Sequence, residues 1–402
     1  MLYLSARIES PGLNPGDGLQ YKFRQRIKMR IKQFIKQETV LIIAAILAVI
    51  SMFFVHPDAQ YADYIDLRTL AILFSLMAVM AGLRQQGVFD KMCQTLLAHT
   101  RNILQLIFVL VGMCFFGSMV ITNDVALLTF VPFTFVVLKK LDANACATLA
   151  VPIVCMQTIA ANLGSMLTPI GNPQNLYLYS KSGMSMGSFI ALMLPYSLLS
   201  LILLIIWIAA FSHKQKIKYA CTFETVNANA PNQKIVIMDA VLFLICLLVV
   251  FRVLHYAIAF GVVLICNLFM DRNALKRVDY SLLLTFVAFF IFIGNLGRIP
   301  AFSEWLQNIL DGREVLVSVL ASQVTSNVPA ALLLSGFTTQ TEGLIIGTNL
   351  GGLGTLIASM ASLISYRQIA RELPDKKGRY FGLFTVSNVI FLALLLLLWW
   401  VI

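Results

Sequence analysis

An asparagine and an aspartate stand together in the middle of a long apolar stretch. Asn123 and Asp124 follow Thr122 in "ITNDVALLTFVPFT" (121–134), and few other polar side chains occur between residues 102 and 138. A carboxylate in hydrocarbon is costly, and such residues mark ion pathways and proton relays. Asp124 is therefore a candidate proton carrier or, when ionised, a cation ligand. The alternative is that Asp124 is a turn residue in water outside a membrane.

A second stretch resembles the first without its aspartate. In "TSNVPAALLLSGFT" (325–338), Ser326 and Asn327 precede Pro329, a pattern typical of the first turn of a helix. These residues could simply cap that helix. A helix that begins inside a membrane also presents free N–H groups and a positive dipole end, which suit an anion. We therefore predict that substrate contacts the two stretches through Thr122, Asn123, Ser326 and Asn327.

Two further apolar segments are interrupted by glycine and small polar residues. "ANLGSMLTPIGNPQNLYLY" (161–179) and "TNLGGLGTLIASMASLISY" (348–366) share Asn, Leu, Gly, Thr, Ile and Tyr at equivalent places. Glycines allow close packing of helices, but a broken helix in a membrane also frees carbonyl groups that suit a hard cation. We predict further substrate contacts from Thr168, Asn172, Thr355 and Ser359. The predicted residues for cation binding or proton coupling are Asp124, Asn123, Asn162, Gly164, Ser165, Asn327, Asn349 and Gly351.

The elements that must position these residues are transmembrane helices. Apolar residues make up 59% of the 402 residues and charged residues only 12%, and several apolar runs approach the roughly 20 residues that cross a bilayer. The net charge of +11 lies mainly in loops, so it indicates the cytoplasmic side and not nucleic-acid binding. Motifs such as H-E-x-x-H, G-x-S-x-G and a phosphate loop are missing, so we expect no enzyme, no cofactor and no structural or catalytic metal.

Lysine and arginine orient the helices, because they favour the cytoplasmic side. The predicted order is a basic cytoplasmic segment (1–38, of which 1–28 is poorly ordered), a first transmembrane repeat (39–211), a cytoplasmic linker (212–234) and a second repeat (235–402). The predicted spans include 39–55, 67–84, 188–211, 235–253, 256–270, 280–297 and 380–402. An amphipathic helix follows Arg84. The C-terminus lies outside.

The two matched stretches are predicted to be re-entrant hairpins of opposite direction. Basic residues bound the first at both ends, so it enters from the cytoplasm, whereas the second (314–338) lacks them at its exit and enters from outside. The sequence thus predicts an all-α polytopic protein of the plasma or inner membrane. It has two inverted repeats, each with a re-entrant hairpin and a broken transmembrane helix, an architecture typical of secondary transporters.

These motifs resemble the ion transporter superfamily, in particular its arsenite permeases, D-type sodium/proton antiporters and citrate-type anion permeases. The resemblance covers residues 35–402 and rests on "TNDVALLTFVPF", "TSNVPAALLL" and the two Asn-Leu-Gly breaks. It implies inverted repeats and commonly a homodimer with an elevator-like transport domain. Dicarboxylate transporters in this superfamily carry Ser-Asn-Thr at both tips, in contact with substrate carboxylate and Na⁺. This sequence has Thr-Asn-Asp at 122–124 and Ser-Asn-Val at 326–328 instead.

The expected function is secondary active transport of a small inorganic or organic anion, coupled to Na⁺ or H⁺. One alternative is a sodium/proton antiporter or an arsenite efflux permease. Another, from a different class, is a passive anion channel. The expected partners are the lipid bilayer, the anion and the coupling cation.

The orientation leads to a labelling prediction. In a cysteine-free background, single cysteines at Ala62 and Thr341 should react with an impermeant maleimide added outside. Cysteines at Asn229 and Asp375 should react only after the membrane is opened. The reverse pattern would overturn the orientation and, with it, both hairpin assignments.

Overall fold

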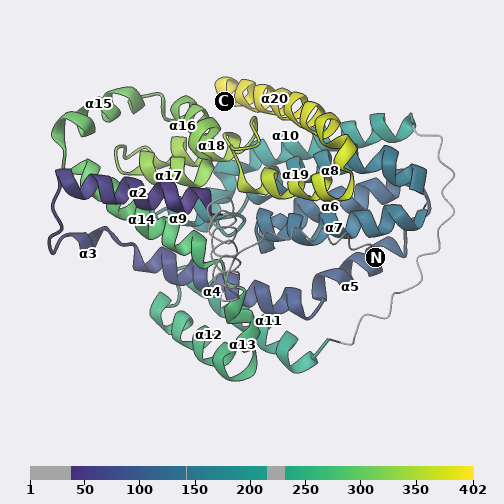
Figure 1. The fold of residues 1–402 in the computed structure, drawn as a ribbon, viewed down its shortest axis with the longest axis horizontal. Helices are drawn as coiled ribbons and strands as arrows, with labels where there is room; N and C mark the ends of the chain where they lie inside the picture. The colour runs from purple at the N-terminus through teal and green to yellow at the C-terminus, as the bar shows by residue number, and fades with distance from the viewer. Residues whose placement is uncertain (1–37, 142, 215–230) are drawn as a thin grey trace, which may run out of the picture.

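The computed structural model describes residues 38–141, 143–214 and 231–402 (Figure 1). These residues form helices joined by turns and loops, and none of them lies in a strand. The predicted disorder of residues 1–28 and most of the predicted linker fall outside the described residues. Seven helices are long and apolar enough to cross a membrane, namely Leu67–Gln85, Ile103–Ile121, Cys146–Ser165, Met186–His213, Gln233–Val250, Tyr280–Gly297 and Pro374–Val401.

Each predicted hairpin is a pair of helices with a one-residue tip. The first pair is α6 (Ile103–Ile121) and α7 (Asn123–Leu141), and the second is α16 (Glu314–Thr325) and α17 (Asn327–Ser335). Thr122 and Ser326, between the helices, have φ of 66° and 76° and ψ of 150° and 155°. Non-glycine residues rarely adopt this conformation, so both tips hold strained backbone.

Each glycine-rich segment is an interruption between two helices. The first lies between α8 (Ala143–Ser165) and α9 (Pro173–Ser182), and the second between α18 (Thr341–Leu350) and α19 (Met360–Glu372). The interruptions span residues 166–172 and 351–359, so both predicted helix breaks are present in the structure.

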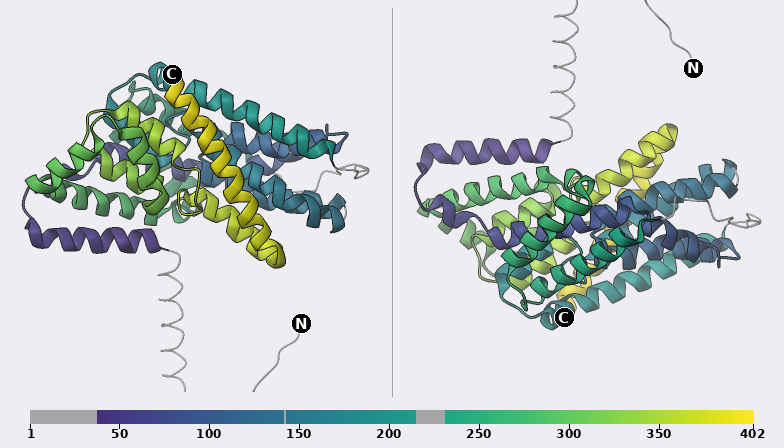
Figure 2. Two further views of the ribbon diagram at one scale, coloured as in Figure 1. Left: turned by 90° about the horizontal axis from the view of Figure 1, so that it is seen from above. Right: turned by 90° about the horizontal axis from the view of Figure 1, so that it is seen from below.

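Twelve further helices complete the described residues, and the seven that correspond to predicted spans lie close to the predicted bounds. The twelve are α2 (Thr39–Phe54), α3 (Tyr61–Tyr64), α4 (Leu67–Gln85), α5 (Val88–Leu97), α10 (Met186–His213), α11 (Gln233–Val250), α12 (Tyr256–Met270), α13 (Arg272–Lys276), α14 (Tyr280–Gly297), α15 (Pro300–Leu310), η1 (Pro374–Lys376) and α20 (Lys377–Val401). The bounds of α14 coincide with the predicted span. The long helix α20 packs on α8 and α10 and runs along the outside of the molecule (Figure 2).

The helices pack mainly as two groups. In the first group α14 packs on α2, and α4 packs on α11, α12 and α13. In the second, α8 packs on α6, α7, α10, α19 and α20, while α18 packs on α9, α16 and α17. The groups meet where α4 contacts α9 and where α14 contacts α17. The second group thus has two parts, with the first hairpin on α8 and the second hairpin on α18, and the two breaks connect these parts.

Gly164 lets the first break approach the first hairpin closely. A Cβ at this position would lie 2.0 Å from the Phe115 carbonyl oxygen of α6, and main chain cannot move aside as a flexible side chain can. Gly112 lies on α6, one turn before Phe115, and a Cβ there would meet no other atom within 4 Å. The two glycines therefore offer a matched pair for substitution.

Gly164→Ala should lower the free energy of unfolding by about 1–3 kcal/mol, because overpacking costs that much in a filled core. Gly112→Ala should be neutral or stabilising by up to about 1 kcal/mol through helix propensity. Thermal unfolding of both variants in detergent measures the difference. Equal midpoints for the two variants would show that α6 and the break are not in close contact.

Candidate functional site

Each hairpin tip is held by the main chain of the break in its own half. The amide of Asn123 donates to the Gly171 carbonyl at 3.0 Å, and the amide of Asn327 donates to the Ala358 carbonyl at 2.9 Å. Gly171 and Ala358 are equivalent positions when residues 161–179 are aligned with 348–366. The same hydrogen bond thus forms in both halves and accompanies the strained tip conformation.

Asn162, near the end of α8, connects the first tip to the second break. Its Oδ1 accepts hydrogen bonds from Asn123 Nδ2 at 3.1 Å and from Ser359 Oγ at 3.0 Å. Its Nδ2 donates to Ser362 Oγ at 3.4 Å. All four side chains are buried. A predicted cation residue and a predicted substrate residue therefore meet here.

Asn349 makes the equivalent connection in the other direction. Its Nδ2 donates to Asn175 Oδ1 at 2.6 Å, and its Oδ1 accepts from Asn172 Nδ2 at 3.2 Å. In the alignment of the two breaks, Asn349 corresponds to Asn162, while Asn172 and Asn175 correspond to Ser359 and Ser362. Each asparagine thus binds the far side of the other break, so the two interruptions are bonded reciprocally.

A cavity of about 420 Å³ lies where α4 meets α9. Thr122 and Asp124 of the first tip line it, together with Asn172 at the start of α9. Arg84 and Arg277 line it from the first helix group, and apolar side chains of α4 complete the wall. Two helix N-termini and two guanidinium groups, which attract anions, therefore border one cavity together with the carboxylates of Glu38, Asp124 and Asp279.

Asp124 is half-buried, and its Oδ1 is buried without a hydrogen-bond partner among the described residues. Its main-chain amide is bound by the Oδ1 of Asn123 at 2.9 Å. Asp124 lines the cavity, and a buried carboxylate oxygen without a partner can bind a proton or a cation. The role of Asp124 as the coupling residue stays a prediction.

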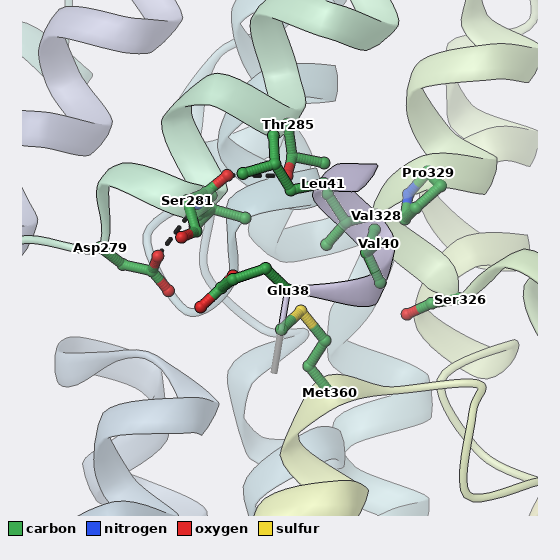
Figure 3. A pocket seen from close by; sticks show the side chains of 11 residues that line it. Glu38, Val40, Leu41, Asp279, Ser281, Thr285, Ser326, Val328, Pro329 and Met360 are labelled. Atoms are coloured by element: carbon green, nitrogen blue, oxygen red, sulfur yellow. Dashed lines mark hydrogen bonds between the residues drawn. The ribbon is translucent and has the colours of Figure 1, made fainter. Parts of the chain in front are cut away.

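A smaller cavity of about 40 Å³ adjoins the large one and shares Glu38, Asp279 and Leu282 with it. Figure 3 shows Glu38 and Asp279 at one side of this cavity, with Ser326 of the second tip at the other. The Asp279 carboxylate also accepts the Leu282 amide at 2.9 Å at the start of α14. The two tips therefore border neighbouring cavities.

The remaining predicted residues hold the breaks in shape. Thr168 Oγ1 donates to the Met119 carbonyl, and the exposed Thr355 donates to the Gln323 carbonyl at 3.2 Å. Ser165 Oγ donates to the Asn162 carbonyl at 2.9 Å. Gly351 packs closely against Ser322, as Gly164 packs against Ser118. Of the eight predicted substrate residues, Thr122, Asn172 and Ser326 line the two cavities.

The predicted side-chain cap of the second hairpin is not formed. Ser326 occupies the N-cap position of α17 but accepts no hydrogen bond from the helix. Its hydroxyl donates instead to the Ala358 carbonyl at 3.4 Å and to Asn327 Oδ1 at 3.5 Å. The positive φ at Ser326 directs the side chain away from the first turn, which explains the difference.

Sequence reasoning missed four side chains of this region. Arg84 and Arg277 served only to orient helices, although an arginine at the end of an apolar run can also face a cavity. Asn175 was not selected, although it lies in the same polar run as Asn172. Gln323 was passed over as well; a glutamine within an apolar helix was the available signal.

Comparison with known proteins shows similarity to membrane transporters. The model of the citrate transporter family matches residues 31–342. The chain is 31% identical over 330 residues to the inner membrane protein YbiR of Escherichia coli strain K12, covering 79% of this chain and 84% of that protein. It is 29% identical over 340 residues to an uncharacterized transporter of Methanocaldococcus jannaschii, covering 84% and 91%. A match of 30% over 154 residues, 38% of this chain, is to a silicon efflux transporter of Oryza sativa subsp. japonica.

The strain at the first tip can be measured with two variants. Thr122→Ala and Thr122→Gly both remove the hydroxyl, but only the glycine relieves the conformation, which costs about 1–3 kcal/mol for other residues. After glycine's own entropic cost of about 0.5–1 kcal/mol, Thr122→Gly should be more stable than Thr122→Ala by about 1 kcal/mol. Thermal midpoints in detergent test this, and a less stable glycine variant would contradict it.

Proposed function

This chain belongs to the citrate transporter family and is a secondary membrane transporter, and from that premise we propose that it moves a small inorganic or organic anion driven by Na⁺ or H⁺. The family is one of transporters and not of enzymes. The anion binds in the cavity beside the first tip, and the coupling cation or proton binds at Asp124. Substrate contacts come from Thr122 and Asn172, with Ser326 on the adjoining side.

The large cavity is the observation that carries this proposal. It combines the N-termini of α7 and α9 with Arg84 and Arg277, which attract negative charge, and Glu38 and Asp279 line it as well. In the same cavity Asp124 has an oxygen without a partner. A proton or Na⁺ on this carboxylate removes its repulsion of an anion, so the two ligands stabilise each other's binding. That mutual stabilisation is the thermodynamic basis of coupling.

The equivalent hydrogen bonds support two inverted repeats. Both tips have the same backbone conformation and the same main-chain hydrogen bond to their break. Asn162 and Asn349 form equivalent hydrogen bonds, each with side chains of the opposite half. Segments predicted on one side of the membrane also contact each other. Arg298 forms an ion pair with Asp58 at 2.8 Å between two predicted outside loops. Lys139 and Glu372, both predicted to be cytoplasmic, are 2.7 Å apart.

The packing of two helix groups supports elevator-type transport. Both hairpins and both breaks lie in one group, and the cavities lie where this group meets the other. Movement of the second group past the first would carry the anion across without separating the tips from their breaks. We propose that the first group forms the fixed scaffold and the interface of a homodimer. Arg84 and Arg277 line the cavity, and both are predicted to be cytoplasmic, which supports an inward-facing state.

The anion could be exported from the cell instead of imported. The similarity to a silicon efflux transporter over 154 residues favours it, and an arsenite permease or a sodium/proton antiporter would also export its substrate or ion. Uptake into proteoliposomes with the gradient imposed in either direction, using a panel of inorganic and organic anions, distinguishes import from export. Accumulation against a concentration gradient separates all of these from a passive channel.

The role of Asp124 can be tested with an isosteric substitution. Asp124→Asn keeps the volume of the side chain but removes the group that binds a proton or cation, so gradient-driven transport should fall by about tenfold or more. Expression and thermal stability should stay close to those of the wild type. Proteoliposome transport under an imposed Na⁺ or pH gradient is the measurement.

Two control variants sharpen this test. Asp375→Asn removes a carboxylate from η1, outside both cavities, and should leave transport unchanged. Asn327→Ala, at the second tip, should weaken substrate affinity but retain gradient dependence, because no charge is lost. Transport at wild-type rate and coupling by Asp124→Asn would refute the role assigned to this residue.

A further inference from the structure

The two hairpins differ at a position that lies beside each break. Met119 of α6 and Gln323 of α16 stand at equivalent places, each three residues before its tip. The carbonyl of each accepts a hydrogen bond from the equivalent threonine of its break, Thr168 or Thr355. The two side chains therefore occupy matching locations, but only glutamine carries an amide.

In the second break this amide fills the carbonyl cluster. Gln323 Nε2 lies 3.0 Å from the Gly351 carbonyl oxygen, 2.9 Å from that of Leu353 and 3.2 Å from that of Val319. Its Oε1 accepts the amide of Thr355 at 2.9 Å. One nitrogen is thus surrounded by three carbonyl oxygens, an arrangement that otherwise suits a hard cation.

Gly354 makes room for this amide. It has φ of 104°, and a Cβ there would lie 2.3 Å from Gln323 Oε1. The second break is therefore shaped around the glutamine side chain. The carbonyl groups of Gly351 and Leu353 have their partner within the protein and do not require an ion.

The first break is held more loosely. Asn175 Nδ2 is its nearest amide donor, at 3.5, 3.4 and 3.3 Å from the carbonyl oxygens of Ser165, Met166 and Thr168. These distances lie beyond the usual 2.9–3.0 Å of an N–H···O bond, so a cation could displace this donor. The first tip also provides the carboxylate of Asp124, where the second tip has Val328.

We infer that Gln323 replaces a coupling cation in the second half, so that coupling takes place through the first half alone with one cation or proton per anion. This inference rests on the proposed function, since it concerns the coupling ion of that same transport. It assigns Gln323 and Met119 as the residues that determine how many cations bind. It also removes Gly351 from the predicted cation ligands, because its carbonyl is occupied.

Exchange of the two side chains tests the inference. Gln323→Met removes the amide and frees the carbonyl cluster, whereas Met119→Gln brings an amide into the first break. Gln307→Met is the matched control, since it removes an exposed amide from α15 that donates to Ser303. The probe is NaCl titrated against choline chloride at constant ionic strength.

The first readout is the thermal midpoint of purified protein, which needs no transport. Gln323→Met should gain stabilisation by Na⁺ over choline relative to the wild type and to Gln307→Met. Met119→Gln should lose any Na⁺ stabilisation that the wild type shows. If Gln323→Met does not fold, Gln323→Glu should show the same gain, because a carboxylate facing carbonyl oxygens needs a cation. A folded Gln323 variant with the Na⁺ response of the wild type would overturn the inference.

The second readout is Na⁺-dependent transport. If Na⁺ drives uptake, the Hill coefficient for Na⁺ should be about 1 in the wild type and rise to about 2 in Gln323→Met. A wild-type coefficient of about 2 would overturn the inference. Lack of gradient-driven transport by the wild type would instead refute the proposed function, and the thermal titration would still decide whether Gln323 closes the second break.

Discussion

The structure depends on pairing the main-chain groups that two interrupted helices leave free among apolar side chains. In hydrocarbon each unpaired N–H or C=O costs several kcal/mol, so an interruption persists only if other groups satisfy it. The chain meets this requirement within each half: the tip amides of Asn123 and Asn327 bind carbonyl groups of the breaks, and so do the side-chain amides of Asn175 and Gln323. Side chains also bind across the two breaks. Asn162 binds Ser359 and Ser362, and Asn349 binds Asn172 and Asn175. These side-chain bonds join the two breaks to each other, while the main-chain groups of each break are paired within its own half.

The same requirement places strain at the tips. Each tip amide reaches a carbonyl of its own break, and the preceding residue adopts a positive φ. Hydrogen bonding at the break thus sustains the backbone strain at Thr122 and Ser326. Such strain persists only where the surroundings over-determine the conformation, as the two-sided bonding of the breaks does here. The tips are held rigidly in one helix group, while the cavities open at its boundary with the other.

Much of this arrangement could be predicted from the sequence. Apolar periodicity, the positions of lysine and arginine, and the repeated Asn-Leu-Gly indicate the helices and both interruptions, and α14 has its predicted bounds. The pairing across the breaks could not be predicted, because Asn162 and Ser359 are far apart in the sequence and meet only after both halves pack. Arg84 illustrates a second limit. Its position at the end of a span indicates orientation, but only packing shows that it also faces Asp124 across a cavity.

The two halves are alike in the residues that hold the tips and breaks in place, and they differ in the residues proposed to determine ion binding. Equivalent asparagines, threonines and glycines form equivalent contacts, so the two breaks are held by the same kinds of interaction. In the aligned halves Asp124 corresponds to Val328, so the first half has a carboxylate where the second has a hydrocarbon side chain. Met119 corresponds to Gln323, so the second half has an amide where the first has a thioether. An amide nitrogen is a permanent partner for carbonyl oxygens, whereas a proton or cation can leave. The equivalent contacts therefore stabilise both halves, and a proton or cation that can bind and leave is required only in the first half.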